Sequence, residues 1–341
     1  MPTFLSPFRR LAGVSPLSRL AGACLAGVVG LTASAASAQS YPTKPVSIVV
    51  PFTAGGPTDT VARNLADAMT KAIPGSNFIV ENLGGAGGTI GAAKVAKASP
   101  DGYMLLLHHI GMSTAPALYR RLPFDPLKDF EYIGLINEVP MTFLTKNDLP
   151  PKSIAELLPY LKANADKVTM ANAGVGSASH LCGLLFMSQI GQDLTTVPYK
   201  GAAPAITDLI GGQVDLLCDQ TTNTTQHIKA GKVKALAVTT AKRLSTLPDL
   251  PTMAESGLTG FNVSVWHALY APKGTPKPVI DKLVAALQQG LKNPELIKRF
   301  AELGTEPVPS DRATPEALNK FLVSEIDKWT PIIRKANIYA D

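Results

Sequence analysis

The sequence lacks a long apolar run, a basic cluster and an abundance of cysteine. The apolar stretch from Leu20 to Leu31 falls well short of the roughly 20 residues of a transmembrane helix, and no later segment is long enough. Lysine and arginine form no cluster with interleaved aromatic residues, which argues against a nucleic-acid partner. Of the three cysteines, only Cys182 and Cys218 lie beyond residue 38. They could form a disulfide in an oxidising compartment. Two buried free thiols are the alternative, because a large core is stable without a disulfide.

Signatures of catalysis and metal binding are also missing. The segment Gly176–His180 is not a G-x-S-x-G elbow because its last position is histidine, and no HExxH motif occurs. His108 and His109 are adjacent at the end of an expected strand, so we expect their side chains to point to opposite faces. The glycine-rich loops match neither GxGxxG nor GxxxxGK. We therefore expect no catalysis, no metal and no cofactor, with an exported hydrolase as the alternative.

The first 38 residues have the order of a secretory signal peptide. A basic start with Arg9, Arg10 and Arg19 contains no acidic residue, and the apolar stretch is followed by the small residues 35–38. This order predicts cleavage after Ala38 and export; a membrane anchor is the alternative, which the short apolar stretch disfavours. Cleavage removes three of the 32 basic residues and none of the 26 acidic ones, so the net charge falls from +6 to +3.

Beyond the leader, short β-branched runs alternate with helical patterns. Residues 46–50 form the first such run, and Val61, Leu65, Met69 and Ile73 then repeat at the four-residue spacing of one helix face. The alternation continues through residues 78–107 and again through 168–230. It predicts an α/β fold in which parallel strands are covered by helices on both faces.

Two strand-like stretches without a neighbouring helix interrupt this alternation, at residues 132–145 and 261–271. We interpret them as crossovers between two lobes, with a hinge near 141–145 and 261–266, and expect only helices after the second one. The segment between them opens with a capping box at Ser153–Glu156. The predicted division is 1–38 signal peptide, 39–141 first lobe, 142–262 second lobe and 263–341 the rest of the first lobe.

The expected first lobe carries two loops rich in glycine, each between a strand and a helix. In the loop 51–59, Gly55 and Gly56 let backbone N–H groups face a ligand, and the positive end of the next helix suits a carboxylate. A plain tight turn capped by Thr58 or Asp59 is the alternative. The loop 84–91 also combines glycines with the start of a helix, so it offers a carboxylate the same backbone N–H groups and positive helix end. In an α/β sheet such loops gather at one edge, where ligands bind.

The expected second lobe offers hydroxyl and acidic side chains at equivalent turns. Ser177 and Ser179 can donate to a carboxylate, and one of them is expected to cap its helix instead. Asp219 directly follows a buried strand and could meet a ligand ammonium group, or cap the helix near Asn223. Lys200 could supply charge to a second carboxylate or lie on the surface.

Several motifs in register resemble one family, the Bug solute-binding proteins of tripartite tricarboxylate transporters. They are Tyr41-Pro42, Pro51-Phe52 with Gly55-Gly56 and Asp59, Glu81-Asn82 with the loop 84–91, Pro100-Asp101-Gly102-Tyr103, and Tyr199-Lys200-Gly201. The resemblance runs from Tyr41 to the end of the chain, and the stretch 219–224 resembles the subgroup with aspartate-binding members. The sequence departs from the family at His108-His109, where relatives often carry small hydroxyl residues.

The resemblance implies a periplasmic binding protein type II-like Venus flytrap that closes over a small carboxylate. Ligands of the family range from amino acids to di- and tricarboxylates and aromatic acids. The implied partners are the membrane components of a tripartite tricarboxylate transporter, or a sensor kinase, and we expect a monomer. The candidate ligand-binding residues are Phe52, Ala54, Gly55, Gly56, Asp59, Gly87, His109, Gly176, Ser177, Ser179, His180, Tyr199, Gly201, Asp219 and Thr222.

Overall fold

The computed structural model describes residues 41–335, 337, 339 and 340, and the chain from Pro42 onward forms one compact unit. The predicted signal peptide, residues 1–38, lies outside the described residues. Within them, none of the helices combines the length and the apolar character that a bilayer crossing demands.

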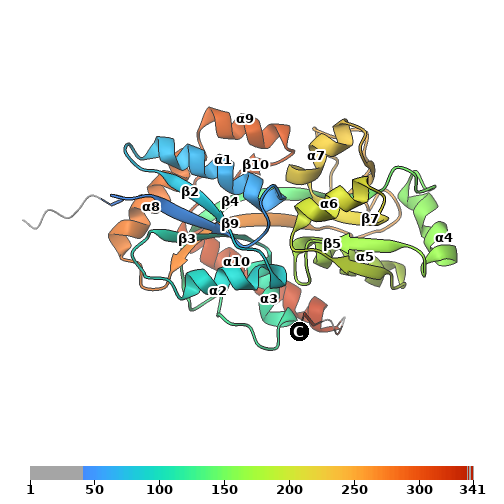
Figure 1. The fold of residues 1–341 in the computed structure, drawn as a ribbon, viewed down its shortest axis with the longest axis horizontal. Coiled ribbons are helices and arrows are strands. Elements are labelled where there is room, and N and C mark those ends of the chain that lie inside the picture. The colour runs from blue at the N-terminus through green and yellow to red at the C-terminus, as the bar shows by residue number, and fades with distance from the viewer. Residues whose placement is uncertain (1–40, 336, 338, 341) are drawn as a thin grey trace, which may run out of the picture. The chain divides into compact units, whose positions relative to one another are not determined.

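Strands and helices alternate along most of the chain, as the sequence patterns predicted (Figure 1). In order, the elements are β1 (Val46–Val50), α1 (Pro57–Ala72), β2 (Phe78–Asn82), the short 3-10 helix η2 (Ala86–Gly88), α2 (Thr89–Ala96), β3 (Met104–His109), α3 (Gly111–Leu118), β4 (Phe130–Thr145), α4 (Ile154–Asn164), β5 (Thr169–Asn172), α5 (Ala178–Ile190), β6 (Thr195–Pro198), α6 (Ala202–Ile210), β7 (Leu216–Gln220), α7 (Thr221–Lys229), β8 (Lys234–Val238), β9 (Ser264–Pro272), α8 (Lys277–Gly290), α9 (Pro294–Glu302), β10 (Glu306–Pro307) and α10 (Pro315–Lys335).

The strands fall into two groups that meet at β4. The first strand group runs β2-β1-β3-β9-β4, and the second runs β4-β7-β5-β6, with β8 also paired to β4. Strand β1 is parallel to β2 and β3, and β5 is parallel to β6 and β7, which confirms the parallel pairing predicted from the alternation. The loops that follow these parallel strands therefore gather at the carboxyl edge of each group.

Strands β4 and β9 are the two stretches that sequence analysis interpreted as crossovers. They pair antiparallel with each other from Phe130↔Pro272 to Pro140↔Ser264, and β4 then continues into the second strand group by pairing with β7 and β8. Thr239 lies where they part, because its N–H bonds to the carbonyl of Met141 and its carbonyl accepts from the N–H of Val263. The predicted lobe boundaries stay a prediction.

The predicted cap at Ser153 is confirmed, and the structure shows another at Thr314. The Ser153 hydroxyl accepts from the backbone N–H of Glu156, and the Thr314 hydroxyl accepts from that of Ala317. Buried Val61, Leu65 and Met69 confirm the predicted apolar face of α1. The expectation of helices alone after β9 was wrong, because Glu306 and Pro307 pair with β4 as the short strand β10. Helix α3 and strand β8 were not predicted.

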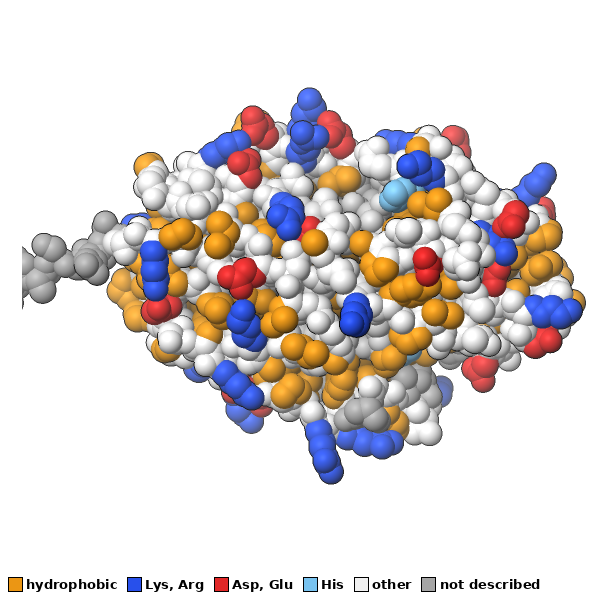
Figure 2. All heavy atoms as spheres, in the orientation of Figure 1, with side chains coloured by type: hydrophobic (Ala, Val, Ile, Leu, Met, Phe, Trp, Pro, Cys, Tyr) orange, Lys and Arg blue, Asp and Glu red, His pale blue; other side chains and the backbone are white. Residues whose placement is uncertain are grey.

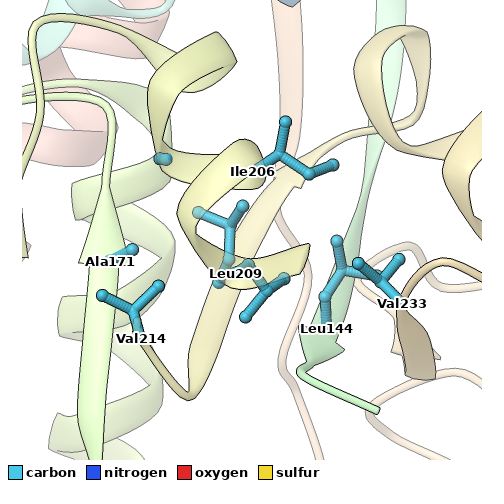
Figure 3. Close-up of a cluster of buried hydrophobic side chains, with 8 residues drawn as sticks. Leu144, Ala171, Ile206, Leu209, Val214 and Val233 are labelled. Carbon is cyan, nitrogen blue, oxygen red and sulfur yellow. The ribbon is translucent and has the colours of Figure 1, made fainter. Parts of the chain in front are cut away.

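The core of the second strand group lies between its sheet and helix α6 (Figure 3). Ile206 and Leu209 project from α6 onto Leu144, Ala171 and Leu217, all nearly inaccessible to solvent. Behind this sheet, Cys182 of α5 and Cys218 of β7 form a disulfide with a Cα–Cα distance of 6.1 Å. The sequence left open whether the two cysteines pair or remain thiols. In the structure they are paired.

One face of the molecule shows its charged side chains scattered among polar and apolar ones (Figure 2). Lysine and arginine side chains occur there singly or beside acidic ones. Ion pairs among the described residues include Lys71–Asp67 and Lys94–Glu81. This face presents no continuous basic surface of the kind that nucleic acid requires.

Candidate functional site

Backbones of the two strand groups meet at the carboxyl edges of their parallel strands. A Cβ added at Gly87 would collide with the carbonyl oxygen of Val175, and one added at Gly201 would collide with the Thr53 hydroxyl. Gly87 also has a left-handed backbone, with φ of +60°. Both glycines therefore allow the loop after β2 and the loop before α6 to approach the opposite group closely.

A narrow cavity of about 10 Å³ lies among these loops, which is room for about one water molecule. It is lined by residues from both strand groups: Phe52, Pro57, Thr58, His109, Ala173, Ser177, Ala178, Ser179, Ala202, Asp219 and Gln220. Five of the predicted site residues are in this set, namely Phe52, His109, Ser177, Ser179 and Asp219. A second hollow, of about 290 Å³, borders Phe52, Gly87 and Tyr199 beside Lys200.

The other predicted site residues support the loops or lie outside the two lining sets. Gly55 and Asp59 bond to each other, as do Gly176 and His180. Gly56 is the N-cap of α1 and Gly201 that of α6, whereas Ala54 is exposed. Thr222 is buried in the first turn of α7. The predicted site therefore remains a hypothesis. Of its residues, only the five named above line the cavity.

Helix α1 directs its N-terminus at the cavity. Pro57 and Thr58 of its first turn line the cavity, and the first-turn N–H groups have no partner within the helix. The helix dipole adds partial positive charge at the same place. This arrangement is suited to an anion.

Four buried polar atoms around the cavity have no hydrogen-bond partner among the described residues. Ser179 Oγ and Gln220 Oε1 belong to cavity-lining residues, Thr53 Oγ1 belongs to the loop after β1, and Thr222 Oγ1 belongs to the first turn of α7. Ser177, by contrast, caps α5 by accepting from the N–H of His180 at 3.1 Å. Buried polar groups are nearly always satisfied, so a group of unpaired ones indicates a place where a ligand or water supplies the partner.

The two acidic site residues differ in how their charge is balanced. The Asp59 carboxylate accepts from Gly55 N–H at 2.8 Å, from Arg63 Nε at 2.9 Å and from Asn82 Nδ2 at 2.9 Å. Asp219 accepts from Asn223 Nδ2 at 2.7 Å, and burial raises its pKa to about 6. No described lysine or arginine forms an ion pair with Asp219. Its charge is therefore available to a cationic or hydrogen-bond-donating ligand.

Three buried histidines cluster beside the cavity. Burial lowers the pKa of His109 to about 3 and those of His108 and His267 well below their ordinary value, so all three are neutral. His109 Nδ1 accepts from the N–H of Gly111 at 2.9 Å, which leaves the proton on Nε2. Phe52 stacks on His109 with ring centroids 4.6 Å apart.

The expectation that His108 and His109 point to opposite faces was wrong. Their rings lie 4.9 Å apart between centroids. The strand ends at His109, and His108 Nδ1 accepts from the N–H of His109 at 2.7 Å, so the His108 ring folds back toward the chain end. Both rings border Gly111, and both contact Phe52. Of the two, His109 lines the cavity.

Two further predicted site residues have their polar atoms engaged away from the cavity. Tyr199 donates to Asp208 at 2.6 Å, and burial followed by that carboxylate raises the pKa of Tyr199 to about 12. His180 Nδ1 accepts from the N–H of Gly176, and burial lowers the pKa of His180 to about 4. Their side chains hold loops in place.

Sequence reasoning missed Gln220 and Tyr119 and assigned Thr58 only a capping role. Gln220 directly follows Asp219, so the end of the buried strand was a usable signal. The Tyr119 hydroxyl donates to the Ala86 carbonyl at 2.7 Å and lies 3.0 Å from that of Val175, a bridge between the two loop sets that no local pattern marks.

Comparison with known proteins assigns the family. A model described as "Tripartite tricarboxylate transporter family receptor" matches residues 61–338. The chain belongs to this receptor family. A protein of Agrobacterium vitis, described as "UPF0065 protein in the TAR-I ttuE-ttuC' intergenic region", is 51% identical over 334 residues, which are 98% of this receptor and 96% of that protein.

Solved structures agree with the assignment. The periplasmic binding protein BugD is 55% identical, with a TM-score of 0.86 over 88% of this receptor and 99% of that chain. MatC from Rhodopseudomonas palustris, solved with bound malate, is 39% identical, with a TM-score of 0.83 over 86% of this receptor and 100% of that chain. The predicted Bug resemblance and Venus flytrap fold are confirmed. The chain is a solute-binding protein of a periplasmic family, which implies a periplasmic location.

Proposed function

We propose that this receptor captures a small carboxylate between the walls of this cavity, which move apart to admit it, and delivers it to the membrane components of a tripartite tricarboxylate transporter. The observation that carries the proposal is the convergence of the α1 N-terminus with the unpaired Ser179 hydroxyl in one buried cavity. Backbone N–H groups, a helix dipole and a hydroxyl donor are complementary to a carboxylate. The malate bound to MatC supports the same class of ligand.

The proposed site combines residues of both lobes in distinct roles. Phe52 and His109 form one wall, and the backbones of Gly55, Gly56, Gly87, Gly176 and Gly201 set how closely the loops approach. Ser177 and His180 fix the start of α5, whose first turn presents Ser179. Asp219 and Thr222 supply the polar surface of the second lobe, and Ala54 and Tyr199 border the approach.

We further propose that closure occurs about a hinge near 141–145 and 261–266, with lobes 39–141 plus 263–341 and 142–262. The contacts of Thr239 support this place, because its hydroxyl donates to Val263 O at 2.6 Å and accepts from Met141 N–H at 3.2 Å. Small-angle scattering should show compaction on addition of ligand. An unchanged radius of gyration at saturation would contradict the hinge.

A thermal-shift screen of the residues 39–341 against a library of carboxylates tests the proposed function. Selective binding should raise the melting temperature in proportion to affinity and concentration. Each stabilising compound is then incubated with the protein and analysed by mass spectrometry, where it should remain unchanged. Chemical conversion of a stabilising compound would favour the exported hydrolase. If no carboxylate in the library stabilised the protein, the proposal would be overturned. Reconstitution with the membrane components or with a sensor kinase then separates transport from signalling.

A further inference from the structure

Thr58, in the first turn of α1, lines the cavity and has no ionic partner. It is buried, and its Oγ1 lies 3.3 Å from His267 Nε2. Behind it, a buried chain of hydrogen bonds continues through Asn137 to Thr305 at the junction of α9 and β10. The direction of every bond in this chain can be assigned.

The assignment starts at the far end. The Thr305 hydroxyl donates to the Glu138 carbonyl at 2.6 Å, so its oxygen accepts from Asn137 Nδ2 at 3.2 Å. Asn137 Oδ1 is then the acceptor that faces His267 Nδ1 at 3.0 Å, which places a proton on that nitrogen. His267 is completely buried and neutral, so Nε2 carries no proton and accepts from Thr58.

The consequence is that the single hydrogen of the Thr58 hydroxyl is directed away from a ligand. Thr58 can offer a ligand only oxygen lone pairs. Asp219, on the opposite wall of the same cavity, offers a carboxylate. Asp219 already accepts from Asn223 Nδ2, but an apolar ligand surface would leave its remaining lone pairs and those of Thr58 Oγ1 without a donor, which costs free energy. The cavity therefore combines anion-binding groups at the helix N-terminus with two hydrogen-bond acceptors that a donor group on the ligand would satisfy.

We propose that Thr58, held in its acceptor orientation by His267 and Asn137, selects carboxylates that carry a hydroxyl or ammonium group next to the carboxylate. The Thr58 backbone N–H and side chain belong to one residue, so the groups that they bind must be neighbours on the ligand. Unsubstituted acids lack the donor and bind more weakly. This inference rests on the proposed carboxylate function and narrows it to 2-hydroxy and 2-amino acids.

The first test uses the native sequence, residues 39–341, in titration calorimetry. Each substituted acid is compared with its unsubstituted parent: L-malate and L-aspartate with succinate, L-lactate and L-alanine with propionate, and L-glutamate with glutarate. Within at least one set the substituted acid should bind about tenfold more tightly, the scale of one hydrogen bond. Equal affinities within every set that binds, or a screen whose hits all lack such a donor, would overturn the inference and leave the carboxylate function standing.

The second test uses Thr58→Val with Thr60→Val as a matched control. Thr60 lies in the same helix turn, and its hydroxyl donates to the Gly56 carbonyl rather than lining the cavity. Thr58→Val should reduce the preference for the substituted acid about fivefold to tenfold and leave affinity for the parent acid nearly unchanged. Thr60→Val should keep the preference. If Thr58→Val weakened both acids equally, Thr58 would be merely structural. If no acid bound the protein in either test or in the screen, the proposed function itself would be wrong.

Discussion

The Tyr119 hydroxyl lies 3.0 Å from the carbonyl oxygen of Val175. Tyr119 follows α3 beside the first strand group, whereas Val175 lies in the loop after β5 of the second. The same hydroxyl donates to Ala86 at 2.7 Å, so one phenol spans the loops on both sides of the cavity. If the lobes close as proposed above, this bridge stabilises their closed arrangement.

Tyr119→Phe should therefore bind ligand more weakly through faster dissociation. Loss of a hydrogen bond of ordinary strength, about 0.5–1.5 kcal/mol, corresponds to a rate increase of roughly twofold to tenfold. Stopped-flow displacement of a bound carboxylate measures it. Tyr160→Phe, on the outer helix α4, is the control and should dissociate as the wild type does. An unchanged rate for Tyr119→Phe would show that the bridge does not contribute to closure.

Gly87→Ala should impair binding of every carboxylate. Its added methyl would collide with the Val175 carbonyl and lie 2.7 Å from the Tyr119 hydroxyl, so the loops could not approach fully. Gly75→Ala is the matched control, because Gly75 also has a positive φ, +79°, and nothing within 4 Å of an added Cβ. Both variants should lose about 1 kcal/mol of stability from backbone strain. Only Gly87→Ala should lose affinity in calorimetry; equal affinities of the two variants would rule out a steric role.

Asp219→Asn should discriminate between ligands. An amino acid should bind more weakly by about 1.5–3 kcal/mol, the scale of a charge-assisted hydrogen bond, whereas its deaminated analogue should be little affected. Calorimetry with L-aspartate and succinate measures the difference. If the preference between them survived the substitution, the carboxylate of Asp219 would not be the group that contacts an ammonium.

The same substitution should stabilise the unliganded protein at neutral pH. The pKa of Asp219 is raised from 3.8 to about 6, so the folded state holds this proton more tightly and loses stability as pH rises between those values. The loss is about 1–3 kcal/mol, and it is complete above about pH 6. Denaturant unfolding of Asp219→Asn and wild type should agree near pH 4 and diverge toward pH 7. The buried histidines titrate alike in both proteins and cancel in the difference, and exposed Asp193→Asn is the control.

The disulfide Cys182–Cys218 should be present in protein purified from the periplasm. Thiol counting on denatured, unreduced protein should then find no reactive thiol. The bond closes a loop with a sequence separation of 36, so replacing both cysteines by serine should cost about 2–4 kcal/mol of unfolding free energy. Two reactive thiols in the exported protein would contradict the pairing.

Most of the fold was predictable because its signals are local. The helix face of Val61, Leu65 and Met69 and the cap at Ser153 each depend on neighbours within one or two turns. The two stretches interpreted as crossovers are indeed strands, β4 and β9, because strand-like residues are also a local signal. The two-residue strand β10 was missed, since it depends on pairing with a partner more than 160 residues earlier in the chain.

The candidate site was predictable only in part. Glycines and hydroxyls after strands identified the loops, and Ser179 and Asp219 lie at the cavity as expected. The roles of Tyr119 and His267 depend on hydrogen bonds to residues 56 and 130 positions away, for which sequence spacing has no signal. Likewise, the packing of His108 against His109 results from the strand ending at that point.

Titration calorimetry with a bound acid and its methyl ester tests the central claim most directly. The acid is the best hit of the thermal-shift screen, and the ester keeps its carbon skeleton while removing the negative charge from the carboxylate that the α1 N-terminus should bind. We predict one binding site for the acid and a loss of at least 100-fold in affinity for the ester, since charge-assisted hydrogen bonds of about 1.5–3 kcal/mol are weakened at more than one donor. An ester that binds as tightly as the acid would contradict carboxylate recognition at this cavity.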